Sequence, residues 1–484
     1  MDRVKTATRV CILGALWITA AVALPAQTFT TLHSFDNTDG SSPGALIQAT
    51  DGSLYGTTAS GGTDGDGTVF KITTDGTLTT LHSFDGTDGL TPSGLVQANN
   101  GKLYGTTTLG GTHDGGTIFE ITLNGALTTL YNFCSGGPDC TDGARPTGLI
   151  QGADGNFYGT ASEGGAHSSG SVFQFALRGG LNTLHSFCSR GNCTDGQTPE
   201  AALVQATNGK LYGTTLGGGT PGEGTVFKIT AQGAFATLYN FCSQTNCMDG
   251  AEPDARLIQG NDGNLYGTTN IGGDIPETSD GTVFKISVSG ALTTLYSFDG
   301  TDGFYPAAGL VQGTDGTFYG TTYDGGISNA TCSEGCGTIY KITSSGALTT
   351  LYSFCSLSNC ADGHGPLGGI IQDTNGSFYG TTEFGGTSDL CSNGCGTVFS
   401  LSVGLGSFLN ISPTSGTVGK GVSILGTDLS GASKVTFHGT SATFTVISGS
   451  EITTTVPTGA TTGLVKVVTP GGTLSSNVPF RVVP

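Results

Sequence analysis

A four-residue segment, Tyr-Gly-Thr-Thr, recurs seven times and sets the period of this chain. It begins at Tyr55, Tyr104, Tyr158 (there as Tyr-Gly-Thr-Ala), Tyr212, Tyr266, Tyr319 and Tyr379, at intervals of 49, 54, 54, 54, 53 and 60 residues. A period near 50 residues with four strand-like runs per period is typical of β-propellers and other repeat arrays. The 84 glycines are therefore expected in turns rather than in a disordered chain.

The second repeat shows the pattern of one unit. Four runs of β-forming residues, at 94–98, 102–107, 116–122 and 126–133, are separated by Asn-Gly turns and one Gly-Gly loop. Asn-Gly is the preferred sequence of two-residue hairpin turns, so neighbouring runs should pair antiparallel. Each repeat is thus expected to form one four-stranded blade.

The two ends of the repeat region complement each other. Residues 28–35 are a lone copy of the fourth run, and residues 396–402 supply a third run after the seventh motif with no fourth run behind it. We therefore predict an all-β fold in which residues 27–404 form a seven-bladed β-propeller, with the N-terminal strand closing the last blade. Such a ring leaves no unpaired sheet edge, whereas an open solenoid would need capping repeats.

The composition changes after Gly404. Residues 405–484 contain no Tyr-Gly motif and no cysteine, and they show several short β runs divided by turns. About 80 residues of this kind suit a small immunoglobulin-like β-sandwich. Because the tryptophan and cysteine pair of antibody domains are missing, its core is expected to be aliphatic.

Residues 1–26 have the pattern of a secretory signal peptide. Arg3, Lys5 and Arg9 precede an apolar run over 10–24, and small residues follow up to a cleavage point after Ala26. A membrane helix is the alternative, but the run is shorter than a span requires. The mature protein is expected to be secreted or held at the cell surface, with no membrane span.

The charge balance is strongly acidic. Loss of the signal peptide would change the formal net charge from −19 to −21. Nucleic acids and anionic membranes are therefore disfavoured as partners, and a monomer is expected. An extracellular glycan or protein is the expected kind of partner.

The twelve cysteines of the mature chain form six close pairs. In an exported protein this pattern predicts local disulfides. Zinc binding is the alternative; it is disfavoured because no pair has the usual two-residue spacing with histidines nearby and because the pairs belong to different repeats. The predicted disulfides are Cys134–Cys140, Cys188–Cys193, Cys242–Cys247, Cys332–Cys336, Cys355–Cys360 and Cys391–Cys395.

Two polar positions recur in every repeat. The motif Asp-Gly-x-x-Pro places a carboxylate in each loop before a first strand, and a glutamine ends each first strand. Turn capping is the favoured role of the aspartates, with calcium binding as the alternative and no other cofactor expected. The glutamines are expected to satisfy backbone groups of a neighbouring blade, with a polar channel as the alternative. The aspartates are Asp39, Asp88, Asp142, Asp195, Asp249, Asp302 and Asp362, and the glutamines are Gln48, Gln97, Gln151, Gln205, Gln259, Gln312 and Gln372.

A binding site in a repeat ring should lie where the symmetry breaks. Arg145, Glu200, Asp254 and Arg256 break it just before three successive first strands, so we predict a mixed-charge ligand site near the channel mouth. An ordinary solvated rim is the alternative. The longest loop insertions, at 274–280, 327–336 and 387–395, should build a wall on one sector of the same face.

No catalytic constellation emerges from the sequence, and the chain is not expected to be an enzyme. His33, His82 and His185 occupy a position that is tyrosine in other repeats, which indicates packing aromatics. No nucleophile elbow, metal-ligand spacing or phosphate loop is present. An acid pair for sugar chemistry could be drawn from the non-repeating Glu163, Glu223, Glu334 and Glu383.

The repeat unit Leu-Val-Gln-x-x-x-Gly-x-Leu-Tyr-Gly-Thr-Thr-x-x-Gly-Gly, followed by Gly-Thr-Val-Phe-Lys-Ile, resembles the GloVer tandem repeat of bacterial surface and exported proteins over residues 28–404. The tail, which contains Ile-Ser-Pro-Thr-Ser-Gly, resembles an IPT/TIG immunoglobulin-like domain. This resemblance implies an exported protein with a display or binding role. It supplies no catalytic residues.

Three functions follow as hypotheses. The favoured one is an exported or cell-surface binding, adhesion or display protein. A secreted polysaccharide-acting enzyme with a site at the channel mouth and a structural envelope component are the alternatives. Non-repeating carboxylates gathered in a deep pocket would favour the enzyme, and a flat polar face would favour display.

Overall fold

The computed structural model describes residues 27–137, 139–274 and 280–483. The predicted signal peptide, residues 1–26, lies outside the described residues. Sheets and short 3-10 turns account for the regular structure: η1 (Gly191–Cys193), η2 (Thr245–Cys247), η3 (Ser358–Cys360) and η4 (Leu429–Gly431). None of the described helices has the length and apolar character that crossing a bilayer requires.

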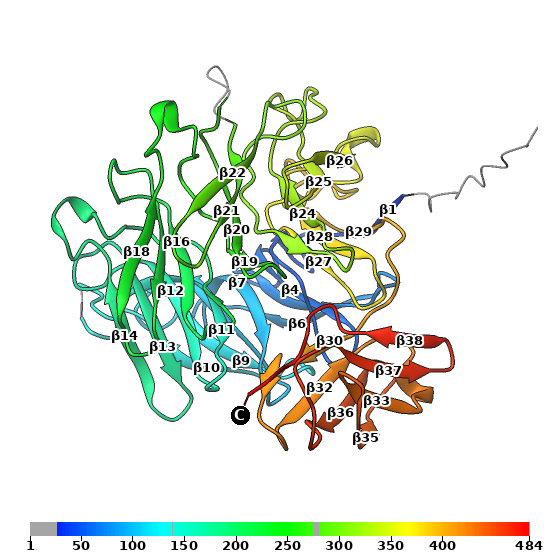
Figure 1. Ribbon diagram of the computed structural model, residues 1–484. Helices are drawn as coiled ribbons and strands as arrows, with labels where there is room; N and C mark the ends of the chain where they lie inside the picture. Colours follow the sequence, from blue (N-terminus) through cyan, green and yellow to red (C-terminus); the bar gives the residue numbers. More distant parts are fainter. Residues whose placement is uncertain (1–26, 138, 275–279, 484) are drawn as a thin grey trace, which may run out of the picture.

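Seven antiparallel sheets, here called blades 1 to 7, are formed by the described residues of the repeat region and are arranged in a ring (Figure 1). From the inner to the outer strand they are β2 (Ser41–Pro43) with β3 (Ile47–Gln48), β4 (Leu54–Ser60), β5 (Thr68–Ile72) and β6 (Leu78–Ser83) in blade 1; β7 (Leu90–Gln97), β8 (Leu103–Leu109), β9 (Thr117–Ile121) and β10 (Leu127–Asn132) in blade 2; β11 (Ala144–Gln151), β12 (Phe157–Glu163), β13 (Ser171–Ala176) and β14 (Gly180–Ser186) in blade 3; β15 (Val204–Gln205), β16 (Leu211–Thr215), β17 (Thr225–Ile229) and β18 (Phe235–Asn240) in blade 4; β19 (Ile258–Gln259), β20 (Leu265–Thr269), β21 (Thr282–Ile286) and β22 (Leu292–Ser297) in blade 5; β23 (Val311–Gln312), β24 (Phe318–Thr322), β25 (Thr338–Ile342) and β26 (Leu348–Ser353) in blade 6; and β27 (Ile370–Gln372), β28 (Phe378–Thr382), β29 (Thr397–Ser402) and β1 (Thr28–Ser34) in blade 7.

The N-terminal strand completes the last blade, as the strand count predicts. β1 pairs antiparallel with β29, from Thr28 opposite Ser402 to Ser34 opposite Thr397. The outer edge of β29 is therefore covered by a strand from the other end of the chain. The ring is therefore closed by hydrogen bonds between β1 and β29, which the chain does not connect directly.

The hydrophobic core lies between neighbouring sheets. One buried cluster spans each of the seven blade interfaces, including the interface where the ring closes. At that closing interface Phe35 and Phe70 pack in one cluster with Tyr379 and Val398. Because burial of apolar surface drives folding, each blade needs both neighbours to complete its core.

The recurring glutamines tie the blades together on the side of the β-hairpin turns. Each side-chain oxygen accepts a backbone N–H two residues beyond the glutamine of the preceding blade, as in the bond from Asn99 to Gln151 (2.9 Å). The last bond runs from the backbone of Thr374 to Gln48 and crosses the closure. The predicted role in satisfying a neighbouring blade is confirmed.

A second set of contacts joins the blades on the opposite side, here called the loop face. The fourth residue of each Asp-Gly-x-x-Pro motif has positive φ and donates its backbone N–H to a loop carbonyl of the preceding blade. Thr91, for example, has φ of 56° and bonds to the carbonyl of Asp66 at 3.0 Å. Non-glycine residues rarely adopt this conformation, so the inter-blade contact must hold it in place.

The seven recurrent aspartates act as structural braces. Each carboxylate binds the histidine or tyrosine near the end of the preceding outer strand. Asp39 contacts His33 at 2.7 Å, and Asp249 accepts the hydroxyl of Tyr239 at 2.7 Å. His33 also packs edge to face on Phe35. The histidines at this position therefore pack as predicted, and they carry a polar contact that the sequence did not indicate.

The C-terminal residues form a two-layered β-sandwich. One sheet contains β30 (Asn410–Ser412), β32 (Gly421–Leu425), β36 (Glu451–Thr455) and β35 (Phe444–Val446), and the other contains β34 (Thr440–Ala442), β33 (Lys434–Phe437), β37 (Val465–Thr469) and β38 (Gly472–Ser475); β31 (Ser415–Gly416) pairs parallel with β39 (Arg481–Val482). Its core is mainly aliphatic, with two phenylalanines, Phe437 and Phe480, in edge-to-face contact.

The sandwich packs against the turn side of the ring, drawn in orange to red in Figure 1. Ser450 donates to the carbonyl of Thr50 at 3.0 Å, and the backbone of Phe408 bonds to Thr374 at 3.0 Å. Between the sandwich and the inner strands lies a cavity of about 650 Å³. The sandwich thus lies on the turn side of the ring, opposite the loop face.

Candidate functional site

An open cavity of about 270 Å³ lies on the loop face between blades 6 and 7. It is lined by Tyr323, Asp324, Thr331, Cys332, Ser333, Glu334, Gly335, His364, Gly365, Phe384 and Asn393. These residues come from the ends of β24 and β28, from the loop before blade 7 and from the long insertions of both blades. Two parts of the predicted wall, the insertions 327–336 and 387–395, therefore contribute to this cavity. Residues 275–279 of the third insertion lie outside the described residues.

The backbone of blade 7 fixes the two central side chains. His364 and Phe384 form an isolated antiparallel bridge, with both backbone hydrogen bonds at 3.1 Å. Their rings lie 5.3 Å apart. These two backbone hydrogen bonds fix the position of His364 relative to the end of β28.

The His364 imidazole is buried and incompletely hydrogen bonded. The residue is 8% exposed, and its ring is hydrogen bonded to the backbone of Asn393. Nε2 has no partner among the described residues. Burial lowers the pKa of His364, so its neutral form is favoured. A neutral ring that donates from Nδ1 presents a lone pair on Nε2, which can accept a hydrogen bond or a proton.

Carboxyl groups whose pKa values are raised lie beside the cavity. Burial, with a smaller effect of nearby Glu334, raises the pKa of Asp324 to about 6. Burial also raises the pKa of Glu383, although Glu383 accepts a hydrogen bond from Tyr323 at 2.9 Å. Glu334 and Glu383, two of the four acids that the sequence offered as candidates, thus lie beside this cavity.

A second acidic group continues the site toward blades 4 and 5. Burial raises the pKa of Asp254 to about 7, with a contribution from Glu200 and despite a hydrogen bond from Asn270 at 2.8 Å. Burial and the charge of Glu252 raise the pKa of Glu200. Tyr305 lies between this acidic group and the cavity. Burial raises its pKa, with contributions from the charges of Asp254 and Asp324. Its ring lies 6.3 Å from that of Tyr323.

The four residues predicted as a ligand site are divided among three places. Glu200 and Asp254 belong to the acidic group just described. Arg145 forms an exposed ion pair with Glu163 at 3.2 Å. Arg256 lines the cavity between the inner strands and the sandwich, where burial lowers its pKa. The structure therefore assembles an acidic site rather than a mixed-charge cluster from these positions, and a ligand role for the four together stays a prediction.

The remaining candidates have other surroundings. Glu223 contributes its backbone carbonyl to the N–H of Glu252, at 2.9 Å. Each of the seven recurrent aspartates is engaged with an aromatic residue of an outer strand, so calcium binding there would require these braces to be broken. All six predicted cysteine pairs form disulfides. Among the described residues, only Cys332, Cys336, Cys355 and Cys360 gather closely enough to hold a metal ion.

Sequence reasoning missed His364, Tyr323, Asp324 and Phe384. Each of these residues occupies a repeat position at which the residue type varies between blades, and this variation could have identified them. Position three of Asp-Gly-x-x-Pro is His364 in blade 7, where the other blades have Ser41, Leu90, Ala144, Gln197, Ala251 and Phe304. The two positions after Tyr-Gly-Thr-Thr hold Tyr323 and Asp324 in blade 6 and Glu383 and Phe384 in blade 7.

Three solved structures that share the fold are similar to most of this chain. A streptogramin B lyase has 14% identity and a TM-score of 0.50 over 78% of this chain and 97% of its own. A catalytically inactive virginiamycin B lyase from Staphylococcus aureus with quinupristin has 15% identity and a TM-score of 0.52 over 78% and 99%. A fungal alcohol oxidase of the AA5 family in complex with copper has 13% identity and a TM-score of 0.52 over 94% and 99%. Identities this low show the β-propeller fold alone.

Family comparisons cover most of the chain. Residues 19–141 and 136–333 match the Gloeobacter/Verrucomicrobia repeat, and residues 407–482 match the IPT/TIG domain. No curated protein matches. The chain therefore belongs to the Gloeobacter/Verrucomicrobia repeat family and carries an IPT/TIG domain behind its repeats.

Proposed function

We propose that this protein is an exported binding protein whose cavity between blades 6 and 7 takes a cationic, hydroxyl-rich ligand of the amino-sugar class. The repeat and IPT/TIG domains fit a surface or binding protein. The six disulfides fit an oxidising compartment outside the cytoplasm. The observation that carries the proposal is the buried Nε2 of His364, which lines the cavity without a hydrogen-bond partner among the described residues.

The cavity offers acceptors and lacks counter-charges. Asp324, Glu334 and the free lone pair of His364 all accept hydrogen bonds. In the described part of the chain, none of the carboxylates at this site forms an ion pair with a basic side chain. A ligand that brings ammonium and hydroxyl donors would satisfy these groups and relieve the repulsion between the acids.

The surroundings suit a ligand longer than one sugar ring. Phe384 provides an aromatic ring in the cavity for stacking or cation–π contact. Of the nine exposed large apolar side chains in the described residues, four lie on loops that also contribute to the cavity: Ile327, Leu357, Leu367 and Leu390. Exposed apolar residues on such loops favour a binding surface. An oligosaccharide could therefore extend from the cavity across this rim.

Calorimetric titration with a glucosamine tetramer tests the proposal, with the N-acetylated tetramer as the uncharged comparison and calcium present or absent. Asp324→Asn and His364→Phe should each weaken binding about tenfold or more, because the first removes the charge of an acceptor and the second removes the Nε2 acceptor while keeping an aromatic ring. Glu163→Gln is the matched control, since Glu163 occupies the same repeat position as Asp324 in blade 3. Equal affinity of the parent and Asp324→Asn, or no binding of either tetramer, would refute the proposal.

An enzymatic function is the second candidate, and one observation favours it. A neutral imidazole and carboxyl groups whose pKa values are raised toward neutrality can work as base and acid near pH 7. Mass spectrometry of oligosaccharides after long incubation distinguishes the two functions. A product that forms with the parent and not with His364→Gln indicates catalysis, whereas unchanged oligosaccharides indicate binding alone.

A further inference from the structure

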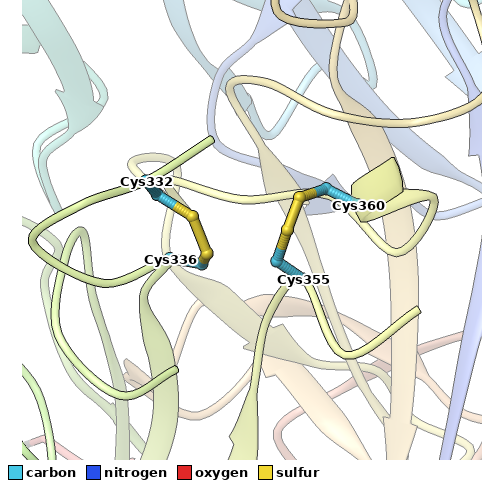
Figure 2. A group of neighbouring side chains, drawn as sticks. All are labelled: Cys332, Cys336, Cys355 and Cys360. Carbon is cyan, nitrogen blue, oxygen red and sulfur yellow. A yellow bond between two sulfur atoms is a disulfide. The ribbon is translucent and has the colours of Figure 1, made fainter. Parts of the chain in front are cut away.

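We propose that Cys332, Cys336, Cys355 and Cys360 form a tetrahedral site for Zn²⁺ when the protein is reduced. The inference does not depend on the proposed ligand, because it rests on the four sulfur atoms alone. All four Sγ atoms lie within 4.8 Å of one another. Figure 2 shows the two pairs facing each other from separate loops, each drawn as a disulfide.

Zinc was disfavoured from the sequence partly because the cysteine pairs belong to different repeats, yet these two pairs lie side by side in the structure. The Cys332 pair lies in the loop between β24 and β25, and the Cys355 pair follows β26, so strand pairing within blade 6 brings the two loops together. A Cys₄ zinc site has Zn–S bonds near 2.3 Å, so its sulfurs are about 3.8 Å apart. All four sulfurs already lie within 4.8 Å of one another, and within each pair the sulfurs can separate to this distance once the S–S bond is reduced.

The protein backbone positions the cysteines independently of the S–S bonds. The N–H of Cys336 donates to the carbonyl of Ile327 at 2.9 Å, and that of Cys355 donates to Gly363 at 3.2 Å. Cys336, Cys355 and Cys360 are buried. A partly formed, mostly dry site of this kind lowers the ordering cost of binding a metal.

Asn329 supplies an outer contact to both pairs. Its side-chain amide lies 3.6 Å from Sγ of Cys336 and 3.2 Å from Sγ of Cys355, both within hydrogen-bonding range for sulfur. Amide donors of this kind stabilise thiolate ligands and orient them on a metal. Asn329 therefore bridges the two halves of the proposed centre.

The chemistry balances with a thiol or phosphine as reductant. The two disulfides take up four electrons and four protons and become four thiols. Zn²⁺ then binds the four thiolates, and the four protons are released, so affinity should rise with pH. Zinc is favoured over hard cations because four soft sulfur ligands in tetrahedral geometry suit it.

The test uses the full chain, reduced with a phosphine in the absence of oxygen, loaded with Zn²⁺ or Co²⁺ and desalted. One metal ion per chain and the visible absorption of tetrahedral Co²⁺–thiolate are expected. Cys332→Ser with Cys336→Ser, or Cys355→Ser with Cys360→Ser, should abolish both signals. The controls are Cys391→Ser with Cys395→Ser and Cys242→Ser with Cys247→Ser, which remove pairs of the same spacings that have no second pair beside them.

Retention of the metal in both control variants and its loss in both test variants supports the site. Absence of metal from the reduced parent, or equal loss in test and control variants, overturns it. If reduction unfolds the chain, Zn²⁺ should restore its circular dichroism and protease resistance in the parent and in the controls alone. A reduced parent that stays unfolded with Zn²⁺ also overturns the proposal.

Discussion

The side-chain oxygen of Gln48 accepts a hydrogen bond from the backbone N–H of Thr374 at 3.2 Å, although the two residues are 326 positions apart in the sequence. The same contact joins six pairs of blades that are also linked by the chain. Between blades 7 and 1 the chain link runs through β1, which is attached to the rest of blade 7 by its hydrogen bonds to β29. Strand β1, the Phe35 cluster and this hydrogen bond together hold blade 7 against blade 1.

Replacement of Gln48 by alanine should lower the free energy of unfolding by about 1 kcal/mol, because the N–H of Thr374 loses its acceptor. Gln205→Ala, which removes the equivalent bond between blades 3 and 4, is the matched variant. Urea unfolding monitored by circular dichroism measures both. Unchanged midpoints in both variants would show that these bonds contribute nothing.

Deletion of residues 28–34 should increase self-association of the chain relative to the parent. The deletion removes β1 and exposes the edge of β29, which can then pair with another chain. Size-exclusion chromatography with light scattering measures the mass, and a lower melting temperature is also expected. A deletion variant that keeps the parent's mass in solution and its melting temperature would contradict the closure role of β1.

Thr91→Gly should raise stability by about 0.5–1 kcal/mol. Thr91 has φ of 56°, a conformation that costs about 1–2 kcal/mol in a non-glycine residue. Glycine relieves this strain, and its greater freedom in the unfolded chain offsets part of the gain. Thermal unfolding at constant pH is the measurement, and a lower melting temperature for the variant would contradict the strain argument.

Asp254 should make stability depend on pH. Its folded pKa, about 7, lies above the ordinary value of 3.8, so the folded state holds a proton that the unfolded state has lost. Stability of the folded state relative to the unfolded state is therefore highest below pH 4. It falls as the pH rises from about 4 to about 7, because the unfolded state ionises first.

Asp254→Asn keeps an acceptor for Asn270 and removes the titration. Relative to the parent, the variant should therefore gain about 2 kcal/mol between pH 5 and pH 8. Urea unfolding at the two pH values measures the difference, with Glu163→Gln as an exposed control. An equal difference between Asp254→Asn and the parent at both pH values would contradict the raised pKa.

Features that repeat were predictable from the sequence. The closing strand followed from counting strand types, and the role of Gln48 followed from a glutamine that occupies one position in every repeat, whereas the contact of Asp39 with His33 was not indicated. A repeated position meets the same neighbours seven times, so a local argument for one blade holds for all.

The surroundings and burial of individual non-repeating residues were not predictable from the sequence. Asp254 and Arg256 are two residues apart, yet one joins the acidic group on the loop face and the other lines the inner cavity. His364 gains its importance from burial beside Phe384, which lies 20 positions further along the chain. The burial that raises the pKa of Asp324 comes from the packed fold, which the repeat pattern does not describe.

A crystal structure of the complex with a glucosamine tetramer tests the proposed binding site most directly. We expect a sugar ring packed on Phe384, a hydroxyl or ammonium group bonded to Nε2 of His364, and an ammonium group beside Asp324. A tetramer bound instead in the cavity that contains Arg256, or on the turn side of the ring, would contradict it.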